Sequence, residues 1–150
     1  MPASAIPRLA QLTIRAETQE TRRACGWLAA AADANRVPAE AATRLDHCLD
    51  EALANVIAHG GPDARASPVD LRLVVQRERG ACSAELTLLY HGVPFDPSVQ
   101  QPPGRPASLA EAQLGGLGLH MLHQFSDAID YARSEGRNEL RITVNWTETT

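Results

Sequence analysis

The sequence is short of aromatic residues and cysteines, and both shortages exclude something. Aromatic side chains make up only 4% of the 150 residues, so leucine, valine, isoleucine and alanine must fill the core. The three cysteines, Cys25, Cys48 and Cys82, include no CxxC pair, so the usual spacing of a cysteine metal site is missing. We expect them to be buried, reduced thiols.

Basic residues and long apolar runs are also scarce. The 14 lysines and arginines are outnumbered by 18 aspartates and glutamates, which gives a net charge of −4. Sequence-independent nucleic-acid binding needs a basic face, so no nucleic-acid partner is expected. No apolar run approaches the roughly 18 residues of a membrane span, and the N-terminus does not resemble a signal peptide. We therefore expect a cytoplasmic protein with no membrane partner.

The length and the pattern of apolar residues predict one domain over residues 1–150. Periodicity and breakers predict a definite order of elements. They are a strand at 9–15, helices at 17–35 and 38–59, a hairpin of strands 69–78 and 82–90, a helix at 115–125, and strands 127–133 and 139–146 joined by a turn at 136–138. Helices and strands are segregated, so the predicted fold class is α+β, with helices covering a mostly antiparallel sheet.

A long stretch between the second hairpin strand and the third helix contains no regular pattern. Residues 92–113 include five prolines and two glycines, too many breakers for a helix or strand. A loop of this length inside a compact domain is usually functional or disordered.

The second helix carries a polar stripe beside its apolar face. His47, Glu51, Asn55 and His59 are spaced by four, which places them in one row along the helix. A carboxylate one turn from a carboxamide oxygen is a plausible way to hold Mg²⁺, which prefers oxygen ligands. A solvated helix edge would show the same spacing.

Two glycine-containing turns flank the long loop. Gly115, Gly116 and Gly118 lie immediately before or within the start of the third helix, where free backbone N–H groups and the helix dipole favour phosphate. Gly92 follows the second hairpin strand, with Asp96 offering a carboxylate nearby. Tight turns alone would also explain such glycines.

Together these segments resemble the GHKL ATPases, in the branch of anti-sigma-factor serine kinases such as RsbW. Residues 50–60 resemble the N box, 92–97 the G1 box and 115–119 the G2 box. Residues 126–131 and 136–140 also look like this branch, so the resemblance runs from about residue 9 to 146. It depends on the order and spacing of all the boxes rather than on any one.

The resemblance implies a two-layer Bergerat-type sandwich that holds ATP between the helices and a lid at about 97–113. It implies that Asn55 coordinates Mg²⁺ and that Glu51 is the general base for phosphoryl transfer, with most of the catalysis being positioning and charge neutralisation. The other residues it places against the nucleotide are His59, Tyr90, Gly92, Phe95, Asp96, Gly115, Gly116, Leu117, Gly118 and Leu119.

The sequence departs from the family at Tyr90. The G1 box normally opens with Asp-x-Gly, and that aspartate accepts a hydrogen bond from the adenine amino group. A phenol is larger and uncharged at neutral pH. Losing the charge-assisted bond would cost roughly 1.5–3 kcal/mol, about ten- to a hundredfold in affinity. ATP and Mg²⁺ binding is therefore in question, and His91, which alternation points to the opposite face, does not substitute.

Two functions follow from these observations. The first is an ATP-dependent serine/threonine kinase that holds a sigma factor and phosphorylates an anti-anti-sigma (STAS) partner. The second is a nucleotide-independent module of the same fold that sequesters a sigma factor or STAS protein. A histidine-kinase catalytic half acting in trans is a third, weaker interpretation. The resemblance also implies a homodimer.

Overall fold

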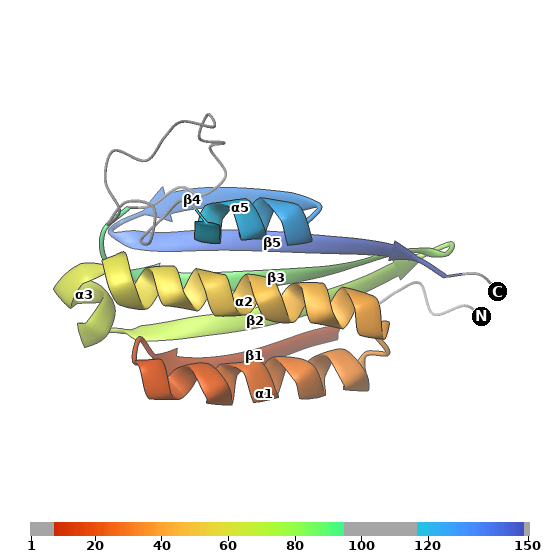
Figure 1. Cartoon of the computed structure of the whole chain (residues 1–150), viewed down its shortest axis with the longest axis horizontal. Coiled ribbons are helices and arrows are strands. Elements are labelled where there is room, and N and C mark those ends of the chain that lie inside the picture. The colour runs from red at the N-terminus through yellow and green to blue at the C-terminus, as the bar shows by residue number, and fades with distance from the viewer. Residues whose placement is uncertain (1–7, 95–116, 149–150) are drawn as a thin grey trace.

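A computed structural model of the chain describes residues 8–94 and 117–148 (Figure 1). The lid expected at about 97–113 lies outside these residues. In chain order the elements are β1 (Arg8–Arg15), α1 (Thr18–Ala34), α2 (Ala39–His59), α3 (Gly61–Ala66), β2 (Pro68–Glu78), β3 (Ala81–His91), α5 (Leu117–Phe125), β4 (Ala128–Ser134) and β5 (Arg137–Thr147). None of the helices described is long and apolar enough to cross a membrane.

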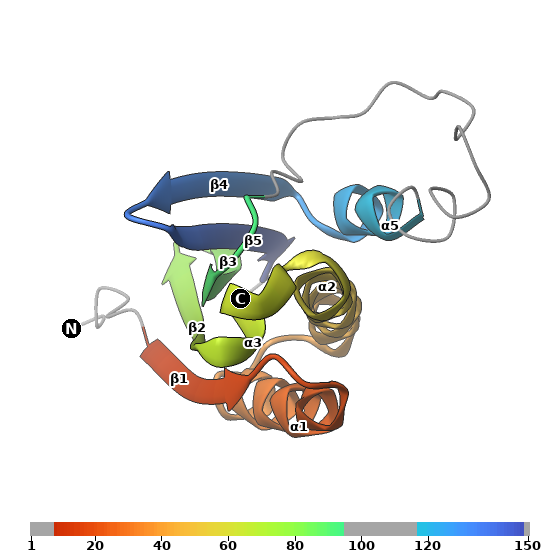
Figure 2. The same cartoon turned by 90° about the vertical axis from the view of Figure 1, so that its left-hand side faces the viewer.

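The strands form one antiparallel sheet, and the helices pack on one of its faces. The strand order is β1-β2-β3-β5-β4, and every neighbouring pair is antiparallel. Figure 2 shows α1, α2 and α5 side by side on the same face of the sheet. The α+β fold class and the two-layer arrangement are confirmed.

The core lies between these two layers and is aliphatic. Alternate residues of the strands point to the helices, so β2 buries Val69, Leu71, Leu73 and Val75. The largest fully buried side chains in the described part of the chain are leucine, isoleucine and valine. The expectation from the shortage of aromatics is confirmed, and Trp27 and Trp146 pack at the margin of the core.

The cysteines are free thiols, as predicted, but one is less buried than expected. Cys48 and Cys82 are buried, whereas Cys25 on α1 is half-buried. Burial raises the pKa of Cys48 to about 12. Burial, followed by the nearby carboxylates of Asp46 and Asp50, raises the pKa of Cys25 to about 11. Both thiols are therefore protonated at neutral pH.

The two hairpins use the same turn, and one of them differs from the prediction. Arg79 and Gly80 connect β2 to β3 with φ values of 51° and 84°, as the sequence predicted. The β4–β5 turn was expected at 136–138 but is made by Glu135 and Gly136, with φ values of 54° and 78°. A two-residue turn with both residues left-handed matches the twist of antiparallel strands, which lets β5 begin earlier at Arg137.

The helix α3 was not predicted. The glycine pair at 60–61 ends α2 at His59, as expected, but the chain then forms a short helix over Gly61–Ala66. Pro62 lies in its first turn, where the missing N–H costs nothing. Ala64 of this helix is buried against the core, which supplies the packing that local sequence did not reveal.

Candidate functional site

The polar stripe of α2 lies at the edge of the core, as predicted. His47, Glu51, Asn55 and His59 are all half-buried, between the buried apolar face and the exposed face of the helix. The His47 ring stacks on the ring of Phe125 in α5, with centroids 4.7 Å apart and planes 18° from parallel. The helix α5 therefore packs beside this stripe.

The packing of α5 determines what lies near the second half of the stripe. The two helices run in opposite directions, with Phe125 at the end of α5 against His47 in the first half of α2 (Figures 1 and 2). The start of α5, at Leu117, Gly118 and Leu119, is therefore directed toward the half of α2 that carries Asn55. A helix N-terminus attracts anions. The candidate N and G2 boxes therefore lie toward the same end of the helix layer.

Asn55 has a polar atom that the fold does not satisfy. Its Nδ2 is buried and has no hydrogen-bond partner among the residues that the structure describes. Burying an amide group without a partner costs about 1–3 kcal/mol, so such a group is usually retained for a reason. The carboxamide oxygen is the type of ligand that Mg²⁺ takes, and Nδ2 can donate to a phosphate or water oxygen. Asn55 therefore fits a residue that holds a hydrated cation and its phosphates.

A pair of glycines joins the end of α2 to the end of β3. Gly92 has φ +123°, and a Cβ on it would lie 2.3 Å from the carbonyl oxygen of Gly60. The same oxygen accepts a hydrogen bond from the Val93 backbone N–H at 3.0 Å. In the described part of the chain, the group that approaches the Gly92 Cα most closely is the backbone of Gly60. The contact fixes the end of the predicted N box against the G1 turn.

Tyr90 is part of the core. It lies on the helix-facing side of β3, is only 3% exposed, and belongs to the same apolar cluster as the leucines of α2. Tyr90 also takes part in a further interaction within the fold. The neighbouring His91 lies on the opposite face, opposite Arg137 of β5, as alternation predicted. The position where the family has a carboxylate is thus filled by a packed aromatic ring.

A buried polar cluster next to Tyr90 was missed by the sequence analysis. Asn138, opposite Tyr90 on β5, is fully buried. Its Oδ1 accepts hydrogen bonds from the Tyr131 hydroxyl and, at 2.7 Å, from Arg133 Nη1. Arg133 Nη1 also donates to the Gly92 carbonyl at 2.8 Å. The burial of Asn138 could have been predicted from the sequence, because Asn138 continues the alternation of the buried residues Leu140, Ile142 and Val144.

An arginine holds α5 in place beside α2. Arg44 donates from Nε to the Phe125 carbonyl at 2.9 Å and from Nη2 to the Asp127 carboxylate at 3.0 Å. The same Asp127 oxygen accepts the Asn145 backbone N–H at 2.6 Å. These bonds connect α2, the end of α5 and β5. The sequence pattern gave no sign of them, because the partners lie more than 80 residues from Arg44 in the chain.

The structure thus places part of the predicted site together. Glu51, Asn55 and His59 lie on one edge of α2, the glycine contact brings the end of that helix to the end of β3, and Leu117–Leu119 begin α5. Four predicted site residues lie outside the described residues: Phe95, Asp96, Gly115 and Gly116.

Comparison with known proteins places this geometry in a family. The sequence profile of the family described as "Histidine kinase-like ATPase domain" matches residues 14–144. The serine/threonine-protein kinase BtrW of Bordetella bronchiseptica is 32% identical over 117 residues, which cover 78% of this chain and 80% of BtrW. A chain in the crystal structure of the SiaB–SiaC complex from Pseudomonas aeruginosa aligns over 95% of this chain and 91% of its own length, with 12% identity and a TM-score of 0.45.

Proposed function

Because the chain belongs to the histidine kinase-like ATPase family, in its RsbW-like branch, we propose that it is an ATP-dependent serine/threonine protein kinase that phosphorylates an anti-anti-sigma (STAS) partner in a partner-switching system. The chain matches BtrW over most of both chains, and BtrW is named a serine/threonine-protein kinase. This match supports the proposed reaction class. The observation that carries the proposal is the buried Nδ2 of Asn55, one helical turn after Glu51, which has no partner within residues 8–94 and 117–148.

Each residue of the site has a separate task in this proposal. Bound Mg-ATP would supply the phosphoryl group, with the Asn55 carboxamide oxygen as a ligand of the metal. The Glu51 carboxylate accepts the proton of the partner's serine hydroxyl, and its half-buried position leaves it accessible to a substrate. The start of α5 offers backbone N–H groups to the phosphates. Most of the rate enhancement then comes from positioning.

The packing of Tyr90 favours a second candidate function. Its ring is 3% exposed and packs in the core where the family's aspartate would meet adenine. In this alternative the chain binds a sigma factor or a STAS protein without nucleotide and acts by sequestration. The two functions differ in nucleotide affinity and in phosphate transfer.

Calorimetric titration with Mg-ATP separates the two candidates. We compare the natural protein with Tyr90→Asp and with Asn55→Ala. Micromolar binding by the natural protein that Asn55→Ala weakens at least tenfold supports the kinase. Binding only by Tyr90→Asp supports sequestration. If none of the three binds, the nucleotide assignment is wrong.

The role of Glu51 is tested by transfer of labelled phosphate from ATP to serine-containing STAS proteins. Glu51→Gln is expected to keep its affinity for Mg-ATP and to lose transfer by about a hundredfold or more, as removal of a general base does. The matched control is Asp50→Asn, the same carboxylate-to-amide change at the exposed neighbouring position of α2. Equal transfer by Glu51→Gln and Asp50→Asn would contradict the assignment.

A further inference from the structure

The two ends of the α2–α5 site differ in how far the protein satisfies its own polar groups. We call the end beside Asn55 and the start of α5 the phosphate end, and the end beside Tyr90, Gly92 and Asn138 the closed end. A buried polar atom without a partner marks a place where a ligand can bind, whereas a saturated atom offers a ligand nothing. The two ends therefore indicate which part of a nucleotide this chain recognises.

The phosphate end contains a buried donor that has no acceptor. Three buried side-chain polar atoms lack a hydrogen-bond partner among residues 8–94 and 117–148, namely Asn35 Oδ1, Asn55 Nδ2 and Arg141 Nε. Asn35 lies in the connection before α2, and Arg141 alternates with the helix-facing residues of β5, so only the Asn55 atom belongs to this site. It can donate to a phosphate oxygen or to water on a bound cation.

The acceptors of the closed end are saturated by the protein itself. Asn138 Oδ1 accepts hydrogen bonds from the Tyr131 hydroxyl and from Arg133 Nη1, which uses both of its lone pairs. The Gly92 carbonyl accepts from Arg133 Nη1 at 2.8 Å and from Asn138 Nδ2 at 3.4 Å, so its lone pairs are also used. Neither oxygen is available to accept a hydrogen bond from the amino group of a base.

The space at the closed end is filled as well. Tyr90 is 3% exposed and Asn138 is 0% exposed. Leu122 on α5 and Leu140 on β5 are 0% and 3% exposed and belong to the same core cluster as Tyr90, so side chains fill the space between α5 and the sheet. A base cannot enter here without displacing packed core residues, which is costly. The base of a bound nucleotide therefore stays outside this packing, in contact with water.

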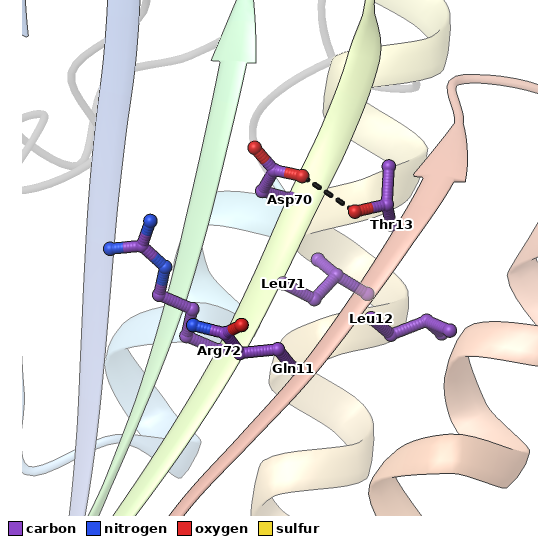
Figure 3. A pocket seen from close by; sticks show the side chains of 6 residues that line it. All are labelled: Gln11, Leu12, Thr13, Asp70, Leu71 and Arg72. Carbon is purple, nitrogen blue, oxygen red and sulfur yellow. Dashed lines mark hydrogen bonds between the residues drawn. The ribbon is translucent and has the colours of Figure 1, made fainter.

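The hollows on the sheet do not provide a replacement pocket for the base. One, with a volume of about 140 Å³, lies on the face of the sheet away from the helices, where its polar lining residues are Gln11, Thr13, Asp70 and Arg72 (Figure 3). A second, of about 600 Å³, surrounds Ser83 near the β2–β3 turn, at the opposite end of β3 from Gly92. A nucleotide held at the α2–α5 site by its phosphates cannot place its base in either hollow.

We propose that the site recognises the triphosphate and not the base, so that any magnesium-bound nucleoside triphosphate serves as the phosphoryl donor. This proposal rests on the proposed kinase function and adds the class of donor to it. In the transfer, the partner's serine oxygen bonds to the γ-phosphorus, the bond from that phosphorus to the β,γ-bridging oxygen breaks, and the nucleoside diphosphate leaves. Glu51 takes the serine proton. The base takes no part in these steps.

The chemistry of the bases explains why selectivity is absent. A site prefers one base only when it holds a group that binds that base better than another, because selectivity is a difference between two affinities. Adenine presents an amino donor where guanine presents a carbonyl acceptor, so a single fixed acceptor or donor would separate them. Water around an outward-facing base satisfies either edge. We therefore expect nucleotides with different bases to bind alike.

Titration of the natural protein with different nucleotides tests the proposal. Calorimetry is carried out with Mg-ATP, Mg-GTP, Mg-UTP and inorganic triphosphate with magnesium. The three nucleotides should have dissociation constants within about threefold of one another, whereas a base-specific hydrogen bond would separate them by about tenfold or more. Inorganic triphosphate should bind within about tenfold of Mg-ATP. Label at the γ-phosphate should reach a serine-containing STAS protein from GTP and UTP as well as from ATP.

Two asparagine variants identify the group that carries the binding. Asn55→Ala should weaken Mg-ATP, Mg-GTP and Mg-UTP by the same factor, about tenfold or more, because Asn55 meets the triphosphate that they share. The matched control is Asn35→Ala, the same change at the other asparagine in the described chain with a buried unpaired atom, and it should bind all three like the natural protein. Circular dichroism checks that both variants are folded.

Tyr90→Asp should introduce selectivity at the closed end. It removes the ring and supplies an acceptor, so Mg-ATP should bind about tenfold more tightly than Mg-GTP, whose O6 is also an acceptor. Equal binding of the two by this variant would overturn the proposal, because the base would then lie elsewhere.

The natural protein separates this proposal from the kinase assignment. If it preferred Mg-ATP to Mg-GTP and Mg-UTP by about tenfold or more, the triphosphate proposal would be wrong and the kinase assignment would stand. If it bound neither the nucleotides nor inorganic triphosphate, both would be wrong. Equal affinities for the three nucleotides, lost in parallel in Asn55→Ala, would support both.

Discussion

Replacing Gly92 by alanine tests whether the end of α2 and the end of β3 are held by backbone contact. The new Cβ would lie 2.3 Å from the Gly60 carbonyl oxygen and 3.0 Å from the Ala64 Cβ. The oxygen belongs to the backbone and cannot move without shifting the end of α2. Alanine would also have to adopt φ +123°, which disfavours any residue with a Cβ. Both effects destabilise the folded state.

Two other glycines separate these effects. Gly136 has φ +78° but no atom of the described residues within 4 Å of its Cβ position, so Gly136→Ala measures backbone strain alone, about 1 kcal/mol. Gly26 lies inside α1, and a Cβ on it would meet none of the described atoms within 4 Å, so Gly26→Ala should stabilise the protein by about 0.5–1 kcal/mol. For Gly92→Ala the strain and the steric overlap together should cost about 2–5 kcal/mol.

Thermal and urea unfolding of the three variants measure these differences. In a chain of this length, each kcal/mol of lost stability lowers Tm by about 2–4 °C. Gly92→Ala is therefore expected to melt about 4–20 °C below the natural protein. Gly136→Ala should fall between Gly92→Ala and the natural protein, and Gly26→Ala should melt above it. If Gly92→Ala cost no more than Gly136→Ala, the close approach of Gly60 would be refuted.

Two further predictions concern arginines that join distant segments. Arg44→Ala removes the hydrogen bonds to the Phe125 carbonyl and to Asp127, and should lower the free energy of unfolding by about 1.5–3 kcal/mol in urea titrations. The control Arg23→Ala, at an exposed position of α1, should change this free energy little. Hydrogen bonds from Arg77, and then from Trp146, hold the pKa of Glu148 below its usual value of 4.5. The contribution of Glu148 is therefore present above about pH 4.5 and is lost as the pH falls through its folded-state pKa. Arg77→Met should flatten this part of the stability–pH profile, and an unchanged profile would contradict the assignment.

The sequence predicted the elements well where one period dominates. The apolar steps of α2 and the alternation of β2, β3 and β5 each reflect a side chain that the fold buries, so periodicity located them to within about two residues. The helix α3 has six residues and no period of its own, and it forms because Ala64 packs on the core. Tertiary contact determines such an element, and a local pattern cannot reveal it.

The placement of the candidate site residues was predicted in the same uneven way. Glu51, Asn55 and His59 share an edge of α2 because helical spacing alone puts them there. Asn138 and Arg133 hold the Gly92 carbonyl from strands that follow it by about 40 residues. Their role depends on the register of the strands, which the local sequence pattern does not determine until the hairpin turn is known.

These contacts explain how the chain can keep Asn55 and Glu51 while it departs from the family at Tyr90. The end of β3 is fixed by protein groups on both sides, because Arg133 and Asn138 bind the Gly92 carbonyl and Gly60 binds the Val93 N–H. The Tyr90 ring packs in the core at this point, so the fold does not need a bound adenine ring to fill the space. A carboxylate at a position that is 3% exposed would be costly without a partner. The variant Tyr90→Asp should therefore be less stable than the natural protein, and an adenine ring that pairs with the new carboxylate should restore part of that stability as the nucleotide concentration rises.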